Sequence, residues 1–171
     1  MNFEAGASLC QSVRLHGGGV TSTVSGMGDV FLHLKYDTGG AGSFALVLDP
    51  YLKLPTAASA VGNGRLEGGL VLPMGYDLGQ GWSLANTPEA DALANAAGNG
   101  AHANISNVVG VGRSFTDGLT LGAELWTDQN FDPAGTSSQY SFDLDAAKLI
   151  DNDTQLDCGA DAQRGSLCWL G

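Results

Sequence analysis

The chain has 171 residues, of which 26 are glycine, 43% are hydrophobic and 15% are charged. This hydrophobic and weakly charged composition excludes a disordered chain, and the length suits one domain over residues 1–171 with a sizeable core. The formal net charge of -11 argues against nucleic acid as a partner, because proteins that bind nucleic acid carry a basic surface.

Short apolar runs separated by glycine-rich turns predict an all-β protein. Eight strands are expected, at about 28–36, 43–54, 65–77, 82–91, 102–113, 119–128, 139–147 and 155–161. The residues before Gly28 are less regular, although "SVRLH" is compatible with part of another strand.

Each predicted strand has one apolar and one polar face, because successive side chains of a strand point to opposite sides. In "DVFLHLKYD", for example, Leu32 and Leu34 alternate with His33 and Lys35. The later strands continue this pattern. The charged side chains expected on the polar face are His33, Lys35, Asp49, Lys53, Arg65, Glu67, Glu124, Asp128, Asp143 and Asp145.

The connections between the predicted strands alternate in length. Short turns near 37–42, 78–81, 115–118 and 148–154 alternate with longer polar loops near 55–64, 93–101 and 129–138. Aromatic residues flank the short turns, namely Tyr36, Phe44, Tyr76, Trp82 and Phe115. Short turns at one end, long loops at the other and aromatic girdles are typical of outer-membrane barrels. Aromatic residues also cap the ends of other β-barrels, so this feature alone decides nothing.

The pattern therefore predicts an up-and-down antiparallel transmembrane β-barrel of about eight strands, complete or incomplete. Its apolar face would contact lipid and its polar face would line the interior, since a bilayer requires every backbone group to be paired. The alternative is a soluble β-barrel or sandwich whose apolar faces pack on each other and bind a small apolar ligand. Charges at the middle of the strands favour the membrane interpretation.

Two stretches conflict with this strand pattern. "TPEADALANAAGNG" reads locally as a helix, with Thr87 as N-cap, Pro88 as the first helical residue and Gly98 as the stop. "DLDAAKLIDN", residues 143–152, also tolerates a helix. Whether 87–98 is strand or helix is left open by the sequence, and a helix there would break a hairpin of the barrel.

Four motifs resemble those of the outer-membrane transporter family labelled putative MetA-pathway of phenol degradation. They are "GMGD" at 26–29, "PYLKLPT" at 50–56, "GNGRLEGG" at 62–69 and "DLGQGW" at 77–82. "HANISNVVGVGRSFTDGLTLGAELW" is also similar, and the resemblance extends over about 26–157. The resemblance implies a bacterial outer-membrane barrel that passes small organic solutes, aromatic ones among them, and it implies no catalytic residues.

The ends of the chain depart from the family pattern. "MNFEAGASLC" has neither the basic start nor the apolar segment of a secretory signal, and "CGADAQRGSLCWLG" differs from the family's last strands. These differences predict a truncated or diverged member.

No residue pattern points to catalysis, a metal or a cofactor, so we expect a protein that is not an enzyme. His16, His33 and His102 lack ligand spacing, and "DNDTQLD" at 151–157 lacks the glycine and the final acid of a calcium loop. Acid pairs such as Glu89 with Asp91 are compatible with a glycosidase pair but are also common on barrel interiors. Cys158 and Cys168 are either two free thiols or a disulfide formed in an oxidising compartment. The expected partners are outer-membrane lipid and an unidentified small solute.

Overall fold

The computed structural model describes the chain except residues 18–19, 41, 116–117, 151–153, 162–164 and 171, and except the side chains of 13, 15–17, 20, 22, 161 and 165–170. The described residues form strands and no helix. The thirteen strands are β1 (Asn2–Ala7), β2 (Gln11–Gly17), β3 (Val20–Gly26), β4 (Val30–Asp37), β5 (Phe44–Leu54), β6 (Glu67–Val71), β7 (Met74–Gly79), β8 (Trp82–Ala94), β9 (Ala101–Ser114), β10 (Leu119–Asn130), β11 (Ser137–Leu149), β12 (Gln155–Asp161) and β13 (Gly165–Leu170).

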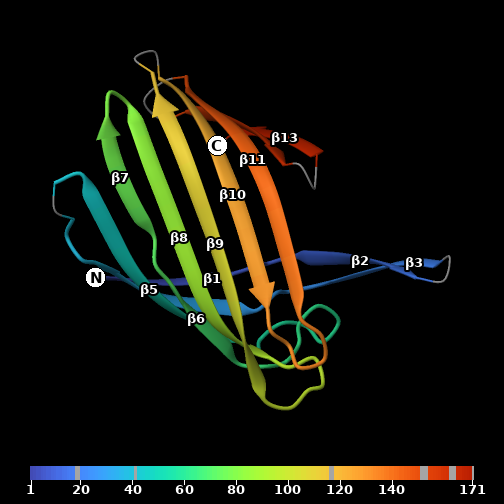
Figure 1. The fold of residues 1–171 in the computed structure, drawn as a ribbon. Coiled ribbons are helices and arrows are strands. Elements are labelled where there is room, and N and C mark those ends of the chain that lie inside the picture. The colour runs from blue at the N-terminus through green and yellow to red at the C-terminus, as the bar shows by residue number, and fades with distance from the viewer. Residues whose placement is uncertain (18–19, 41, 116–117, 151–153, 162–164, 171) are drawn as a thin grey trace.

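Eleven of these strands form one antiparallel up-and-down sheet (Figure 1). Its order is β1-β4-β5-β6-β8-β9-β10-β11-β12-β13, and β7 pairs with β5 and β8. β6 and β7 keep one register against β5, as the pairs Asp49↔Val71 and Leu46↔Met74 show. They are therefore a single strand interrupted at Leu72–Pro73. The predicted all-β class and antiparallel up-and-down arrangement are confirmed.

The first four strands form a long β-hairpin that continues past the edge of the sheet. β1 pairs with β4 and β2 pairs with β3 in the same register, as Asn2↔Lys35 and Gln11↔Gly26 show. The β2–β3 part forms a separate two-stranded sheet that projects from the main sheet (Figure 1). "SVRLH" lies within β2, as the sequence suggested.

The sequence underestimated the number of strands. All eight predicted ranges coincide with strands, the range 65–77 with β6 and β7 together, but β1, β3 and β13 were not predicted. The helical interpretation of the residues from Thr87 is wrong, because β8 continues as a strand to Ala94. Hydrogen-bonded neighbours on both sides decide the conformation: β8 pairs with β6 and β9, and Pro88 O accepts a hydrogen bond of 2.9 Å from Leu72 N. The helix-tolerant residues from Asp143 likewise belong to β11 as far as Leu149.

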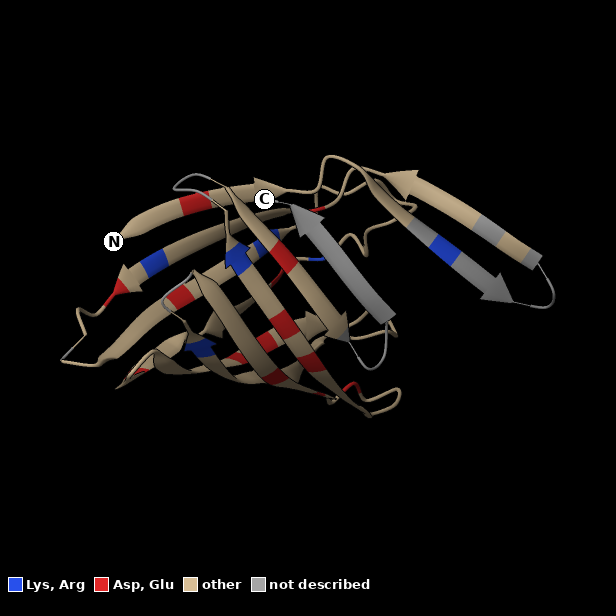
Figure 2. Ribbon diagram, turned by 90° about the horizontal axis from the view of Figure 1, so that it is seen from above, with Lys and Arg blue, Asp and Glu red and all other residues tan. Residues whose placement is uncertain are grey.

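The sheet is strongly curved (Figure 2). Within the described part of the chain no hydrophobic side chain is buried, and the most buried polar residues are Asp49 and Asn104, at 6% and 7% exposure. The apolar face is exposed instead, including Leu52, Leu125 and Phe142. Because the concave face of a curved sheet crowds its side chains, we call the face of Asp49 and Asn104 the inner face and the apolar face the outer face. β1 and β13 form the two edges of the sheet, and they are not paired with each other within the described residues.

Candidate functional site: the polar inner face

The strand register brings the predicted polar residues onto one continuous face. Lys53 is paired with Glu67, Glu124 with Asp143, and Asp128 with Ser106. The same alternation places these predicted residues on the inner face: His33, Lys35, Asp49, Lys53, Glu67, Glu124, Asp128, Asp143 and Asp145. Arg65 lies in the loop before β6, where its guanidinium donates to Gly98 O. That this face lines a pore stays a prediction.

Lys53 is the centre of a buried polar cluster at the long-loop end of β5. Its Nζ lies 2.5 Å from Glu67 Oε2 and 3.4 Å from Asp29 Oδ2, and it donates to Asn63 Oδ1 at 2.8 Å. Asn63 Nδ2 and Ala94 N both donate to Glu67 Oε1, at 2.8 and 2.9 Å. The side chains of Lys53, Asp29 and Glu67 are only 12%, 9% and 10% exposed. One ammonium group therefore compensates two carboxylates that are largely withdrawn from water.

Three of the four sequence motifs meet in this Lys53 cluster. Asp29 ends "GMGD", Lys53 and Thr56 belong to "PYLKLPT", and Asn63 and Glu67 belong to "GNGRLEGG". The loop between β5 and β6 is held there by hydrogen bonds of 2.8 Å from Ala57 N to Asp29 Oδ1 and from Val30 N to Thr56 Oγ1. The motif residues thus fold the loop back onto the start of β4.

Glycine is required where this loop packs closely. A Cβ atom at Gly62 would overlap the side chain of Ala57, and one at Gly69 would overlap Asp91 Oδ1. The glycines of "GNGRLEGG" therefore permit close approach of backbone to side chains. The fourth motif, "DLGQGW", forms the β7–β8 turn, where Asp77 Oδ1 accepts a hydrogen bond from Gly79 N at 2.8 Å.

The stability that Asp29 gives to the β5–β6 loop depends on pH, because it depends on whether the Asp29 carboxyl is ionised. Burial opposes its ionisation, but the hydrogen bond from Ala57 N and the Lys53 ammonium outweigh burial and hold the pKa of Asp29 below its ordinary value. A lowered pKa in the folded state adds stability that is present above the unfolded pKa of about 3.9 and is lost as pH falls through the folded pKa.

We therefore expect Asp29→Asn to destabilise the protein at pH 7 and to have a smaller effect at pH 3. Urea unfolding midpoints of the wild type and the variant at both pH values measure this difference. The same loss of stability at both pH values would contradict the assigned role of the Asp29 charge.

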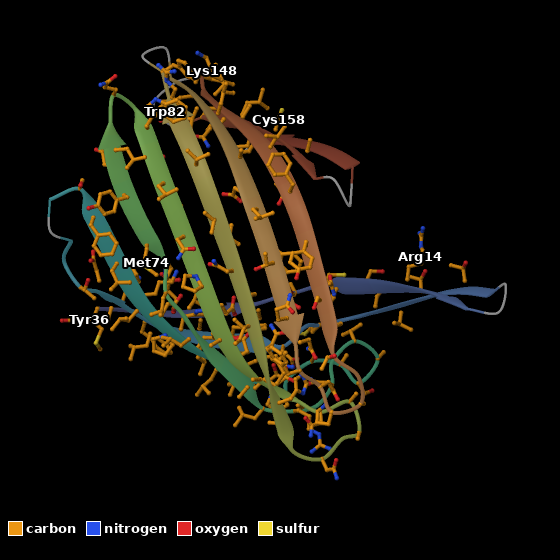
Figure 3. The ribbon with its side chains drawn as sticks, in the orientation of Figure 1. Arg14, Tyr36, Met74, Trp82, Lys148 and Cys158 are labelled. Carbon is orange, nitrogen blue, oxygen red and sulfur yellow. The ribbon has the colours of Figure 1, made fainter. Side chains whose placement is uncertain are left out.

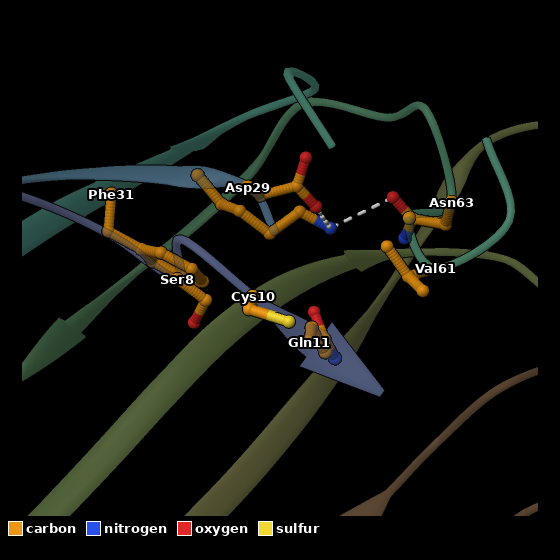
Figure 4. A pocket seen from close by; sticks show the side chains of 9 residues that line it. Ser8, Cys10, Gln11, Asp29, Phe31, Val61 and Asn63 are labelled. Atoms are coloured by element: carbon orange, nitrogen blue, oxygen red, sulfur yellow. Dashed lines mark hydrogen bonds and ion pairs between the residues drawn. The ribbon is translucent and has the colours of Figure 1, made fainter. Parts of the chain in front are cut away.

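Two cavities flank the Lys53 cluster at the long-loop end. The first, of about 500 Å³, lies at the base of the projecting hairpin (Figure 4), where Asp29 and Asn63 face Ser8, Cys10 and Gln11. The second, of about 550 Å³, lies on the other side of Asn63 and is lined by residues of the loops after β8 and β10. Space for a solute therefore remains beside the cluster.

The second cavity includes His102, which the sequence left without a role. His102 Nδ1 lies 3.0 Å from Asn95 Oδ1 and 3.6 Å from Asp132 Oδ2. Backbone hydrogen bonds from Ala134 and Ala96 lower the pKa of Asp132, so this carboxyl is negative at neutral pH. Within the described residues no group of three or more His, Cys, Asp or Glu side chains is placed to hold a metal ion.

A second polar cluster, which the sequence did not predict, crosses the middle of the sheet. Tyr51 Oη donates to Asp91 Oδ1 at 2.8 Å, and Asn104 Nδ2 donates to Asp128 Oδ2 at 2.9 Å and to Asp91 Oδ2 at 3.5 Å. Ser106 Oγ donates to a Glu89 oxygen at 3.5 Å. In the sequence, Glu89 and Asp91 were compatible with a glycosidase-like acid pair or with acids of a barrel interior, and whether their segment is strand or helix was left open. The strand conformation of β8 places them on the inner face beside Asn104.

The two walls of the inner face differ in how their charges are compensated. On β4 and β5 both lysines have an acidic partner: Lys35 lies 2.8 Å from Glu4, and Lys53 lies 2.5 Å from Glu67. His33 Nδ1 also lies 3.1 Å from Asp49 Oδ1. On β8 to β11 the described inner-face residues include no lysine or arginine. The acids of this second wall, which we call the acidic wall, are Glu89, Asp91, Glu124, Asp128, Asp143 and Asp145.

The predicted aromatic residues lie on the outer face near the short turns. Tyr36 is the last residue but one of β4, and the rings of Phe44 and Tyr76 lie 5.6 Å apart on β5 and β7. Trp82 begins β8 and Phe115 follows β9, and the guanidinium of Arg113 lies 5.0 Å from the centre of each of their rings. All but Phe44 are among the exposed large hydrophobic side chains. Their role at a membrane interface stays a prediction.

The structure describes the side chains of two of the three cysteines. Cys10 is free and exposed. Cys158 is disulfide-bonded, and its register partner across β12 and β13 is Cys168. This agrees with the disulfide alternative of the sequence analysis. The calcium-loop candidate at 151–157 lies partly outside the described residues.

Comparison with known proteins decides the family. The model of the family described as "Putative MetA-pathway of phenol degradation" matches residues 6–165. This chain belongs to that family. The match extends on both sides of the region that the motifs suggested and includes β2, β3 and β12. Comparisons with curated proteins and with solved structures gave no match. In the described part of the structure, no helix has the length and apolar character needed to cross a membrane.

Proposed function

We propose that this member of the MetA-pathway phenol-degradation family forms part or all of an outer-membrane β-barrel that lets small organic solutes cross passively. The observation that carries the proposal is the distribution of side chains, which is the reverse of that in a soluble protein. Large apolar residues are exposed on the outer face, whereas Asp49, Lys53 and Asn104 are buried on the inner face. Burial of apolar area drives the folding of soluble domains, so this face requires an apolar surrounding such as lipid.

The inner face argues against the soluble alternative. A soluble barrel that binds an apolar ligand needs an apolar interior, whereas the inner face here carries the Lys53 cluster and the acidic wall. In a bacterial outer membrane, the short turns near Trp82 and Phe115 would face the periplasm and the long loops the exterior. The apolar side chains of the outer face would contact lipid tails.

The distribution of charge suggests which solutes would pass. The lysines of β4 and β5 are already paired with acids, so the excess charge of the interior is negative and concentrated on the acidic wall. Rings of acidic side chains favour cations over anions. The family name associates these proteins with phenol degradation, and a neutral phenol would be admitted where a carboxylate would be repelled. The solute class therefore comprises neutral or cationic small organic molecules.

Reversal potentials in a planar bilayer with a KCl gradient test this proposal. We expect single-channel steps with a reversal potential of the cation-selective sign. Substituting Glu124→Gln, Asp143→Asn and Asp145→Asn together should move that potential toward zero, while Asp37→Asn, at the exposed end of β4, should leave it unchanged.

Two outcomes would contradict the proposal. Membrane insertion without any conductance would mean that the paired charges fill the interior, as side chains do in the smallest barrels. Preference for chloride over potassium would contradict the role of the acidic wall.

A further inference from the structure

Arginine and lysine occur together on the outer face, where apolar residues dominate. Trp82 is paired with Arg113 across β8 and β9, and Arg113 with Leu121 on β10. One row closer to the short turns, Phe115 N bonds to Leu119 O, and Leu119 is paired with Lys148. The register therefore places Arg113 and Lys148 on the same face in neighbouring rows, and Figure 3 shows Trp82 and Lys148 at the same end of the sheet.

The position of Arg113 leaves its positive charge available to a ligand. Its guanidinium lies between the Trp82 and Phe115 rings, 5.0 Å from each centre, which fixes the planar group through cation–π attraction. Within the described residues no carboxylate lies within ion-pair distance of it. A fixed guanidinium has a fork of donors that matches two phosphate oxygens.

The charge of the whole chain makes this position unusual. The net charge is -11, and the chain has only seven lysine and arginine residues. Two of these seven lie on the outer face at the end where the predicted aromatic residues gather. A positive group at the depth of the aromatic residues would meet lipid headgroups, whose phosphates lie just beyond the hydrocarbon.

We propose that Arg113, held by Trp82 and Phe115 and assisted by Lys148, binds the phosphate of an anionic phospholipid at the short-turn rim of the sheet. We call these four residues the rim site. The inference rests on the membrane location in the proposed function, and it assigns a specific lipid contact that pore activity does not require. The remaining outer-face side chains around the rim site would contact the acyl chains of the same lipid.

The test uses the full chain refolded into vesicles of phosphatidylcholine alone or with added phosphatidylglycerol. The folded fraction is measured against urea by the mobility of unboiled samples on an SDS gel. We expect phosphatidylglycerol to raise the folding equilibrium constant of the wild type about fivefold, the effect of one basic residue near an anionic surface. Simple repulsion between a chain of charge -11 and an anionic membrane predicts the opposite sign.

Three variants isolate the rim site. Arg113→Gln should lose the gain from phosphatidylglycerol, and Arg113→Lys should keep part of it. Arg14→Gln, in the projecting hairpin, removes an exposed charge far from the outer-face rows and should keep all of it. An equal response to phosphatidylglycerol in the wild type and Arg113→Gln, or no response in the wild type, would overturn the inference.

The outcomes separate this inference from the proposed function. A chain that conducts ions but responds equally to both lipids refutes the rim site and leaves the pore. A chain that responds to phosphatidylglycerol through Arg113 but never conducts supports the rim site and refutes the pore. A chain that does not insert into either kind of vesicle overturns both.

Discussion

Replacing Lys53 with methionine is expected to destabilise the protein by about 3–5 kcal/mol, the usual cost of leaving a buried ion pair with one partner. Lys53 is the only cation within ion-pair distance of Asp29 and Glu67 among the described residues. Methionine preserves the length of the side chain but leaves both carboxylates, each about one-tenth exposed, without a positive partner. The β5–β6 loop, which Asp29 holds through Ala57 N, should loosen as well.

Urea unfolding of the refolded chain, followed by mobility on an SDS gel, measures this loss. Lys35→Met is the matched control, because Lys35 lies on the neighbouring strand and pairs with Glu4 where both side chains are exposed. Exposed pairs contribute little, so this variant should remain close to the wild type. Equal losses for the two variants would show that the Lys53 cluster has no special role in the fold.

Replacing Leu125 with arginine is expected to cost about 2–4 kcal/mol of folding free energy in a membrane, the cost of arginine on the lipid face near the middle of a barrel. Leu125 lies near the middle of β10 on the outer face, with Val109 and Phe142 as its register partners. Its exposed fraction is 49%. At an exposed position of a soluble protein the same substitution would change stability by no more than about 0.5 kcal/mol. The two interpretations of the sheet therefore predict different results.

Leu121→Arg is the matched control for the depth of the substituted residue in the membrane. Leu121 lies on the same strand and the same face but is paired with Arg113 near the short turns. Because the cost of arginine falls to about 0–1 kcal/mol near the interface, this variant should fold almost as well as the wild type. Folding yields in lipid vesicles at a series of urea concentrations compare the two. Similar small losses for Leu125→Arg and Leu121→Arg would contradict lipid contact at the centre of the outer face.

The sequence predicted the sheet well where side chains alternate strongly. Leu32 and Leu34 alternate with His33 and Lys35 on β4, and the register confirms that such residues lie on opposite faces. β3 has a weaker signal, because in "VTSTVSG" the two valines share their face with a serine and a glycine and no large apolar residue is present. β1 and β13 are edge strands at the ends of the chain, and their short sequences carry little pattern. These strands are specified mainly by their pairing partners.

The candidate site was predictable in composition but not in its contacts. Alternation placed Lys53 and Glu67 on one face, but nothing in their spacing showed that they share Asn63 or that Lys53 also contacts Asp29. Glu89 and Asp91 were not among the predicted inner-face residues, because Pro88 and the alanines after it favour a helix locally. Cross-strand hydrogen bonds outweigh that preference, which is typical of tertiary structure overriding propensity. Tertiary register, which a single sequence does not provide, joins the motifs into one cluster.

The central claim is that the outer face contacts lipid, and heat modifiability tests it most directly. The chain is refolded in detergent and run on an SDS gel with and without boiling, alongside circular dichroism and a sample without detergent. Our account predicts a folded band of different mobility that disappears on boiling, a β-type spectrum, and aggregation when detergent is withheld. A single band unaffected by boiling, from a chain that stays monomeric and folded in detergent-free buffer, would contradict it.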